Sequence, residues 1–291
     1  MKIALIGCGE VGHCYARAWT SAGHTLVGIC ELRTDDEMVR RAQAAGAPLY
    51  TAPGPWLAAA DAVVSAVYGY NAAEVAQEAL PHLRAGAVYA DFTTASAGDM
   101  QAAARAAARF PIEFTDVAIM GAIALLAEKT PLLCAGGGSQ VVTALGESAG
   151  APVRFIDGQP GDAVRLKLLR SVMTKGMESL AVECMVAAER MGLRESLYEV
   201  LADIDRTPLT AFMDSFVRSH VLHAPRRLAE VREARDQLHE AGLEPLVLNG
   251  VEQLFDRTTR GIEAARAKGD APAPDTVEAR LAWLTTLARQ S

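Results

Sequence analysis

The sequence lacks a long uninterrupted hydrophobic run, although 51% of its 291 residues are hydrophobic. A helix that crosses a bilayer needs about 20 consecutive apolar residues, whereas charged residues and glycines interrupt every apolar stretch of this chain. The first residues, MKIALIG, carry one lysine and an apolar stretch too short for the hydrophobic region of a signal peptide. We therefore expect a soluble, cytoplasmic protein without a membrane partner.

Positive charge is also scarce. The chain has 28 Lys and Arg against 35 Asp and Glu, which gives a formal net charge of -7. Because proteins hold nucleic acids largely by neutralising phosphates with basic side chains, this balance argues against a nucleic-acid partner. The G-x-S-x-G, H-E-x-x-H and P-loop motifs of other enzyme classes are absent as well.

The cysteines form no recognisable framework. They are odd in number, include no C-x-x-C pair and lie at no zinc-ligand spacing with histidines. This pattern predicts buried free thiols and no metal site. The five are Cys8, Cys14, Cys30, Cys134 and Cys184.

In the first half of the chain, short β-type runs alternate with Ala-rich helical stretches. This alternation is typical of a parallel sheet covered by helices. It predicts an α/β fold with an amino-terminal Rossmann-type, doubly wound sheet over residues 1–158. The expected strands are residues 2–6, 25–30, 62–67, 87–91, 112–119, 131–137 and 153–156.

After residue 158 the pattern becomes helical throughout. Residues 162–191 contain no proline and a single glycine, which predicts one long central helix. Residues 159–291 are therefore expected to form an all-α domain for substrate binding and dimerisation. Its other expected helices are residues 195–223, 225–241, 245–268 and 276–289.

The long helix also carries the expectation of a homodimer. Large apolar side chains lie around much of its surface, more than one chain readily covers. Symmetric pairing of two chains through this helical domain would bury them. These residues are Met173, Met177, Leu180, Met185 and Met191.

A G-x-G-x-x-G loop follows the first expected strand and opens a helix. In a dinucleotide-binding loop, Gly7 permits the tight turn, Gly9 lets the backbone approach the pyrophosphate, and Gly12 allows close packing of helix on strand. The free N–H groups and dipole of the helix terminus favour phosphate. Gly7, Gly9, Glu10, Val11 and Gly12 are thus expected to bind the cofactor.

Two further segments are expected at the cofactor. Glu31 ends the second strand, where a carboxylate can accept hydrogen bonds from the adenosine ribose. It favours NAD, while Arg33 leaves NADP possible by offering a partner for a 2′-phosphate. Val67 and Tyr68 follow a buried strand at the carboxyl edge of the sheet, where Tyr68 either forms a wall of the nicotinamide site or is a surface aromatic.

A polar stripe on the long helix supplies the candidate catalytic group. Lys167, Ser171, Thr174 and Glu178 follow one another at intervals of four, three and four residues, so they share one helical face. The intervening leucines face packing partners. Taken alone, a lysine in this position would more often be solvated than catalytic.

Several separated motifs change that interpretation, because with them the chain resembles the β-hydroxyacid dehydrogenase family, the relatives of 6-phosphogluconate dehydrogenase. Residues 91–94, DFTT, are similar to the family's D-x-S-T segment, and residues 116–122, DVAIMGA, to its D-A-P-V-S-G-G loop. Gly161, Lys167 and Ser171 match G-x-x-x-x-x-K-x-x-x-N. Met120 and Ser171 depart from the family's Ser and Asn.

The resemblance implies the function and the roles of the site residues. Lys167 would be the general acid/base, with Ser171 beside it, in hydride transfer between nicotinamide and a small hydroxyacid or its semialdehyde. Two other readings stay open, an imine reductase of the same architecture and a non-catalytic NAD(H)-sensing protein. The expected substrate-binding residues are Thr94, Met120, Gly121, Ala122 and Thr174.

Overall fold

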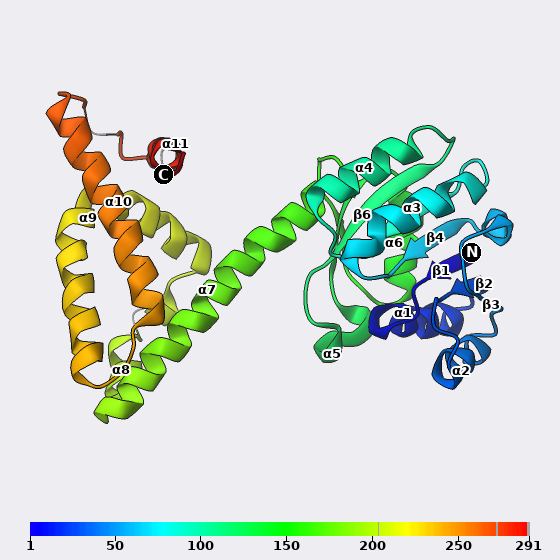
Figure 1. The fold of residues 1–291 in the computed structure, drawn as a ribbon, viewed down its shortest axis with the longest axis horizontal. Coiled ribbons are helices and arrows are strands. Elements are labelled where there is room, and N and C mark those ends of the chain that lie inside the picture. Colours follow the sequence, from blue (N-terminus) through cyan, green and yellow to red (C-terminus); the bar gives the residue numbers. More distant parts are fainter. Residues whose placement is uncertain (203, 272, 290–291) are drawn as a thin grey trace. The chain divides into compact units, whose positions relative to one another are not determined.

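The protein consists of two compact units. A computed structural model describes residues 1–202, 204–271 and 273–289. Unit 1 comprises Met1–Val172 and unit 2 comprises Met173–Ser291. Unit 1 is built on a mostly parallel sheet and unit 2 is helical, so the predicted fold class is confirmed (Figure 1).

Unit 1 contains one eight-stranded sheet in the order β3-β2-β1-β4-β5-β6-β7-β8. The chain starts in the middle of the sheet and winds outward in both directions, which is the doubly wound arrangement. The strands are β1 Lys2–Ile6, β2 Thr25–Cys30, β3 Leu49–Tyr50, β4 Ala62–Ser65, β5 Val88–Asp91, β6 Glu113–Ile119, β7 Leu132–Gly136 and β8 Val153–Phe155.

Helices cover both faces of this sheet (Figure 1). On one face, Trp19 of α1 and Leu145 of α6 are fully buried, and the Trp19 indole donates a hydrogen bond to the Leu145 carbonyl oxygen at 3.0 Å. On the other face, Ala76 of α3 and Met100 of α4 belong to a second buried cluster. The helices of unit 1 are α1 Glu10–Ser21, α2 Asp36–Ala44, α3 Ala72–Ala79, α4 Ala97–Ala107, α5 Ile123–Leu126 and α6 Ser139–Ser148.

The sheet departs from the sequence prediction in two strands. The two-residue strand β3 was not expected, because so short a run has no visible alternation. In addition, β7 pairs antiparallel with β6, whereas the alternating pattern predicted a parallel sheet. The β6–β7 connection contains only the four-residue α5 and a short 3-10 turn, with no helix long enough for a crossover, so the chain returns in the opposite direction.

Unit 2 continues the long helix α7 Asp162–Met191, which agrees with the predicted range. The sequence predicted two helices, 195–223 and 225–241, with a break just before Pro225, and this position of the break was wrong. Pro225 lies inside a single helix α9, and the chain is interrupted earlier, between α8 and α9. None of the helices among the described residues is long and apolar enough to span a membrane. The remaining helices are α8 Arg194–Val200, α9 Leu209–Glu240, α10 Leu246–Ala267 and α11 Val277–Ala288.

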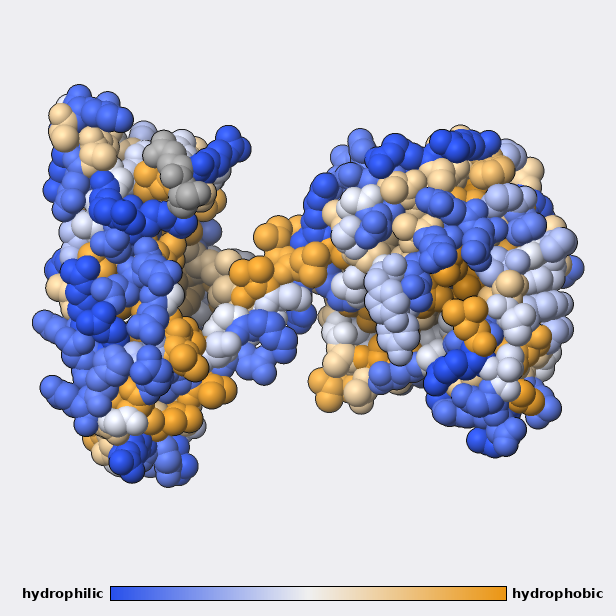
Figure 2. Space-filling model, viewed as in Figure 1, coloured by the Kyte–Doolittle hydropathy of each residue, from blue (hydrophilic) through white to orange (hydrophobic). Residues whose placement is uncertain are grey.

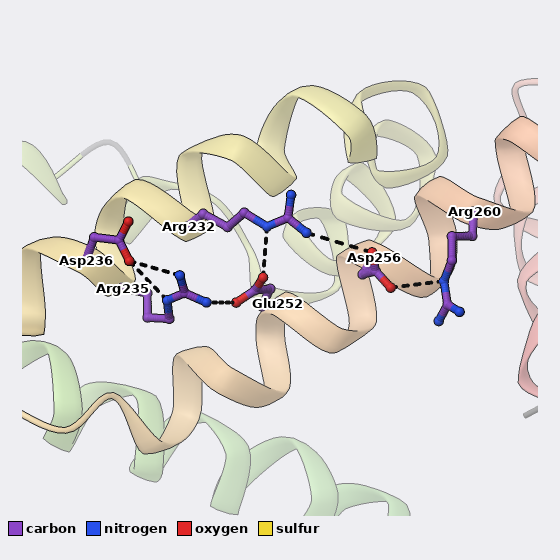
Figure 3. Close-up of polar contacts among 6 residues, drawn as sticks. All are labelled: Arg232, Arg235, Asp236, Glu252, Asp256 and Arg260. Atoms are coloured by element: carbon purple, nitrogen blue, oxygen red, sulfur yellow. Dashed lines mark hydrogen bonds and ion pairs between the residues drawn. The ribbon is translucent and has the colours of Figure 1, made fainter.

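An ion-pair network links α9 to α10 (Figure 3). Arg232 and Arg235 of α9 both reach Glu252 of α10, and Arg232 also lies 3.9 Å from Asp256. Exposed pairs of this kind each contribute at most about 1 kcal/mol. Their spacing along both helices nevertheless favours one register of α9 against α10.

The start of α7 is fixed by a buried carboxylate of the sheet. Asp116, on β6, is fully buried and accepts hydrogen bonds from the backbone N–H groups of Gly161 at 2.8 Å and Val164 at 3.2 Å. These N–H groups belong to the turn that has no acceptor within its own helix. The sequence predicted a domain boundary at 158/159, before α7. The two compact units divide within α7, between residues 172 and 173. The Asp116 hydrogen bonds attach the first turn of α7 to the sheet of unit 1.

We predict that Asp116→Ala lowers the free energy of unfolding of unit 1 by roughly 2–6 kcal/mol, because two buried N–H groups lose their acceptor at about 1–3 kcal/mol each. Asp116→Asn keeps an acceptor oxygen and should cost clearly less. Urea unfolding measures both. Asp162→Ala, which removes a more exposed carboxylate from the same turn, is the control, and equal losses in Asp116→Ala and Asp162→Ala would contradict the anchor.

Candidate functional site

The glycine-rich loop lies between β1 and α1, and its own backbone requires two of its glycines. Gly7 has a φ of +90°, and a Cβ there would lie 2.7 Å from the Ala66 carbonyl oxygen. A Cβ on Gly12 would lie 2.0 Å from the Gly7 carbonyl oxygen. Gly9 differs, because a Cβ there would meet nothing within 4 Å. The space in front of Gly9 is therefore open.

The hydrogen bonds of the loop leave a set of donors available. The Gly7 N–H donates to the Cys30 carbonyl oxygen at 2.8 Å, and the Cys8 N–H donates to the Glu31 carboxylate at 3.0 Å. Within the part of the chain that the structure describes, residues 9–12 have no acceptor for their backbone N–H groups. Open space beside free N–H groups at a helix terminus fits a dinucleotide diphosphate.

Two charged side chains from outside the loop hold it. Glu31 follows β2 and binds Cys8 as described above. Arg41, on α2, donates to the carbonyl oxygens of Cys8 at 2.7 Å and Gly9 at 3.1 Å. Sequence reasoning missed Arg41, since only the tertiary fold brings α2 to the loop and no local motif marks the residue.

A cleft of about 320 Å³ opens beside the loop, at the carboxyl ends of β4, β5 and β6. Among the expected site residues it gathers Val11, Val67, Tyr68, Thr94, Gly121 and Lys167. It also includes Phe92, Ile119 and Ile123, which the sequence analysis did not single out. The cleft lies where ligands of doubly wound sheets bind.

Lys167 and Thr94 meet in this cleft. The Lys167 Nζ donates a hydrogen bond to the Thr94 Oγ1 at 2.7 Å. Burial lowers the pKa of Lys167, and the Asp116 carboxylate acts in the opposite direction. The amine therefore loses its proton more readily than a solvated lysine would, which suits a group that both donates and accepts protons.

Thr94 is held by the turn that follows β5. The Asp91 carboxylate accepts a hydrogen bond from the Thr93 N–H at 2.8 Å, and the Thr93 hydroxyl accepts one from the Ala95 N–H at 3.3 Å. Burial raises the pKa of Asp91 to about 6. From the neighbouring loop, Gly69 approaches so closely that a Cβ would lie 2.7 Å from the Thr94 carbonyl oxygen. The main chain around Thr94 is thus closely packed.

Tyr68 forms the rim of the cleft and is 71% exposed. Its ring stacks on that of Tyr70, with centroids 5.5 Å apart and an interplanar angle of 5°. Tyr68 is thus an exposed aromatic that also lines the cleft, and its role beside a nicotinamide stays a prediction.

The other predicted site residues are not brought into the cleft lining. Met120 packs against a small cluster that includes Ala163, and Ala122 is exposed. The Ser171 hydroxyl donates to the Lys167 carbonyl oxygen on its own helix at 3.0 Å. Thr174 belongs to unit 2. Among the described residues no group of three or more His, Cys, Asp and Glu side chains could hold a metal ion.

The loop, the free helix terminus and the adjoining cleft define a dinucleotide-binding oxidoreductase site, and comparison with known proteins identifies the family. The family described as the NAD binding domain of 6-phosphogluconate dehydrogenase matches residues 2–148, so the chain belongs to it. A second family, a domain of unknown function, matches residues 188–258. The predicted family, nicotinamide-cofactor binding and oxidoreductase class are confirmed.

Solved structures are similar over nearly the whole chain. A conserved hypothetical protein from Sinorhizobium meliloti 1021 is 28% identical over 100% of this chain and 97% of its own, with a TM-score of 0.61. A conserved protein of unknown function, described as structurally similar to 3-hydroxyacid dehydrogenases, is 26% identical over 93% of this chain and 100% of its own, with a TM-score of 0.63. An imine reductase from Streptomyces aurantiacus shares the fold at 17% identity, 97% and 98% coverage and a TM-score of 0.70.

We predict that alanine at either loop glycine weakens NADH binding, but that only one of the two substitutions lowers thermal stability. Gly12→Ala should reduce both thermal stability and NADH binding, because its methyl group overlaps the Gly7 carbonyl. Gly9→Ala should melt close to the wild type but bind NADH more weakly, because its methyl group enters the open space beside the free N–H groups. Thermal melting and NADH fluorescence titration measure the two effects, and undiminished NADH binding by Gly9→Ala would contradict the assignment.

Proposed function

We propose that the protein transfers a hydride between a nicotinamide cofactor and a small hydroxyacid or its semialdehyde, with Lys167 as the general acid/base. The supporting observation is the hydrogen bond between Lys167 and Thr94 in the cleft beside the glycine-rich loop. It joins a lysine and a hydroxyl from distant parts of the sequence at the edge of the sheet where a cofactor of this family binds.

The proposed chemistry assigns proton transfer to Lys167 and a hydrogen bond to the substrate to Thr94. The nicotinamide, when bound, supplies or accepts the hydride. In reduction the Lys167 ammonium donates a proton to the substrate carbonyl oxygen, and in oxidation the neutral amine accepts the hydroxyl proton. Because the Thr94 oxygen accepts from Lys167, its own O–H remains able to donate to a substrate oxygen.

For the cofactor we propose a preference for NAD over NADP. The Glu31 carboxylate beside the loop would repel a 2′-phosphate and suits the ribose hydroxyls of NAD. Arg41 is already engaged by two loop carbonyls and by Glu37. Arg33 remains as an exposed side chain that could serve NADP.

Reduction of a C=N bond is the second candidate. The similarity to an imine reductase concerns the fold, and a lysine in the cleft favours oxygen substrates, because an ammonium is suited to protonate a developing alkoxide. A panel of hydroxyacids, semialdehydes and cyclic imines, each assayed with NAD(H) and NADP(H), separates the two. Tight NADH binding without turnover on the whole panel would instead favour an NAD(H)-sensing protein.

We predict that Lys167→Ala lowers kcat/KM about 10²- to 10⁴-fold while NADH binding stays nearly unchanged, as expected for loss of a general acid/base. In the wild type, kcat/KM for reduction should fall as pH rises through the lowered pKa of Lys167, and kcat/KM for oxidation should rise over the same range. The variant should lose this pH dependence. Lys175→Ala is the matched control, since Lys175 lies on the same helix and is 76% exposed. Near-wild-type turnover by Lys167→Ala would refute the proposed role.

We also propose that the protein is a homodimer that pairs through unit 2. In unit 2, α7 keeps several large apolar side chains exposed, among them Val182 at 60% and Val186 at 50%. Hydrophobic side chains gather along α7 in Figure 2. Pairing of two such faces would remove them from water, which stabilises an assembly by about 25 cal/mol per Å² of apolar surface.

The expected result in sedimentation analysis is a particle of twice the chain mass at micromolar concentration. Replacing both Val182 and Val186 with Glu should shift it to the monomer, because the two charges would be buried without partners. A wild-type chain that sediments as a monomer would contradict the dimer.

A further inference from the structure

Arg41 contacts the glycine-rich loop from outside it, through two main-chain carbonyls. Its side chain is 22% exposed, and one terminal nitrogen donates to the carbonyl oxygens of both Cys8 and Gly9. The other terminal nitrogen pairs with Glu37, one turn earlier on α2. The guanidinium is thus held at both terminal nitrogens, and the nitrogen that reaches the loop has two N–H groups, one for each carbonyl.

The direction of these hydrogen bonds matters because of peptide geometry. In a trans peptide the C=O and the following N–H point in opposite directions. The Cys8 carbonyl shares a peptide unit with the Gly9 N–H, and the Gly9 carbonyl shares one with the Glu10 N–H. Arg41 binds both carbonyls, and the Gly9 carbonyl also accepts from the His13 N–H at 3.0 Å. The two N–H groups therefore face the opposite side, where the described residues give them no acceptor.

Cys8 is held at both of its backbone groups by opposite charges. Its N–H donates to the Glu31 carboxylate, and its C=O accepts from the Arg41 guanidinium. Hydrogen bonds to charged groups are stronger than those between neutral groups. The loop is therefore fixed between a carboxylate from the end of β2 and a guanidinium from α2.

We propose that Arg41 is a positioning residue for cofactor binding, which orients the loop N–H groups toward the diphosphate of the dinucleotide from the far side of the loop. The inference rests on the dinucleotide-binding part of the proposed function and is independent of Lys167. Loop donors that are oriented in advance reduce the ordering cost of binding. Arg41 should therefore affect the affinity for ligands that contain the diphosphate. It should leave the affinity for adenosine unchanged.

The test compares ligands with and without the diphosphate. Calorimetry gives Kd values of NADH, ADP-ribose and adenosine for the wild type, Arg41→Met and Arg41→Lys, with Arg40→Met as the control on the adjacent, exposed position. Arg41→Met should weaken ADP-ribose and NADH binding about 10- to 100-fold through the loss of two charge-assisted hydrogen bonds. Adenosine binding should not change, and Arg41→Lys, which keeps the charge and a donor, should restore part of the loss.

Three outcomes would overturn the inference, and they can be told apart. Unchanged ADP-ribose binding by Arg41→Met, beside a wild type that binds, rejects the role of Arg41 alone. An equal loss for ADP-ribose and adenosine indicates general damage to unit 1, which thermal melting would register. A wild type that binds neither NADH nor ADP-ribose rejects the proposed function together with this inference.

Discussion

The buried carboxylate of Asp116 is the interaction on which the site depends. It stands on a strand of the sheet and accepts the N–H groups at the start of α7. Side chains of an α-helix lean toward its amino terminus, so Lys167, three residues after Val164, extends over the anchored turn. A helix attached at that point delivers its amine to Thr94, and the same carboxylate favours the ammonium form. One acidic side chain thus positions the proposed acid/base and partly offsets the burial that lowers its pKa.

The shape of the glycine-rich loop depends on its glycines and on two charged side chains from outside it. Gly7 and Gly12 are required by the protein itself, because any side chain there would strike the backbone. A side chain at Gly9 would touch no other residue, so its absence leaves room for a ligand beside the loop. Glu31 and Arg41 then fix the peptide planes around it. Steric contacts thus fix Gly7 and Gly12, while hydrogen bonds to charged side chains fix the peptides of Cys8 and Gly9.

Local signals predict much of this architecture. Apolar runs bounded by glycine identify the inner strands, and the absence of proline marks α7. The failures concern features that local periodicity does not report. The β6–β7 connection has no helix long enough for a crossover, so β7 runs antiparallel to β6. Pro225 lies inside α9, which packs along α10. In the site, the loop follows from spacing, while Lys167 and Thr94 are 73 residues apart and were paired only through family resemblance. Arg41 carries no local signal, because its acceptors are main-chain carbonyls that any sequence would provide.

The close approach of Gly69 to Thr94 places packed main chain and exposed side chains next to each other in the cleft. Main chain lies against main chain on that side of the cleft, while the residues that flank Gly69 carry two stacked tyrosine rings, of which that of Tyr68 lines the cleft. A change of the Tyr68 ring would therefore alter the rim of the cleft without moving the main chain beside Thr94. Under the proposed function, the rim and the acid/base would then be separable by substitution.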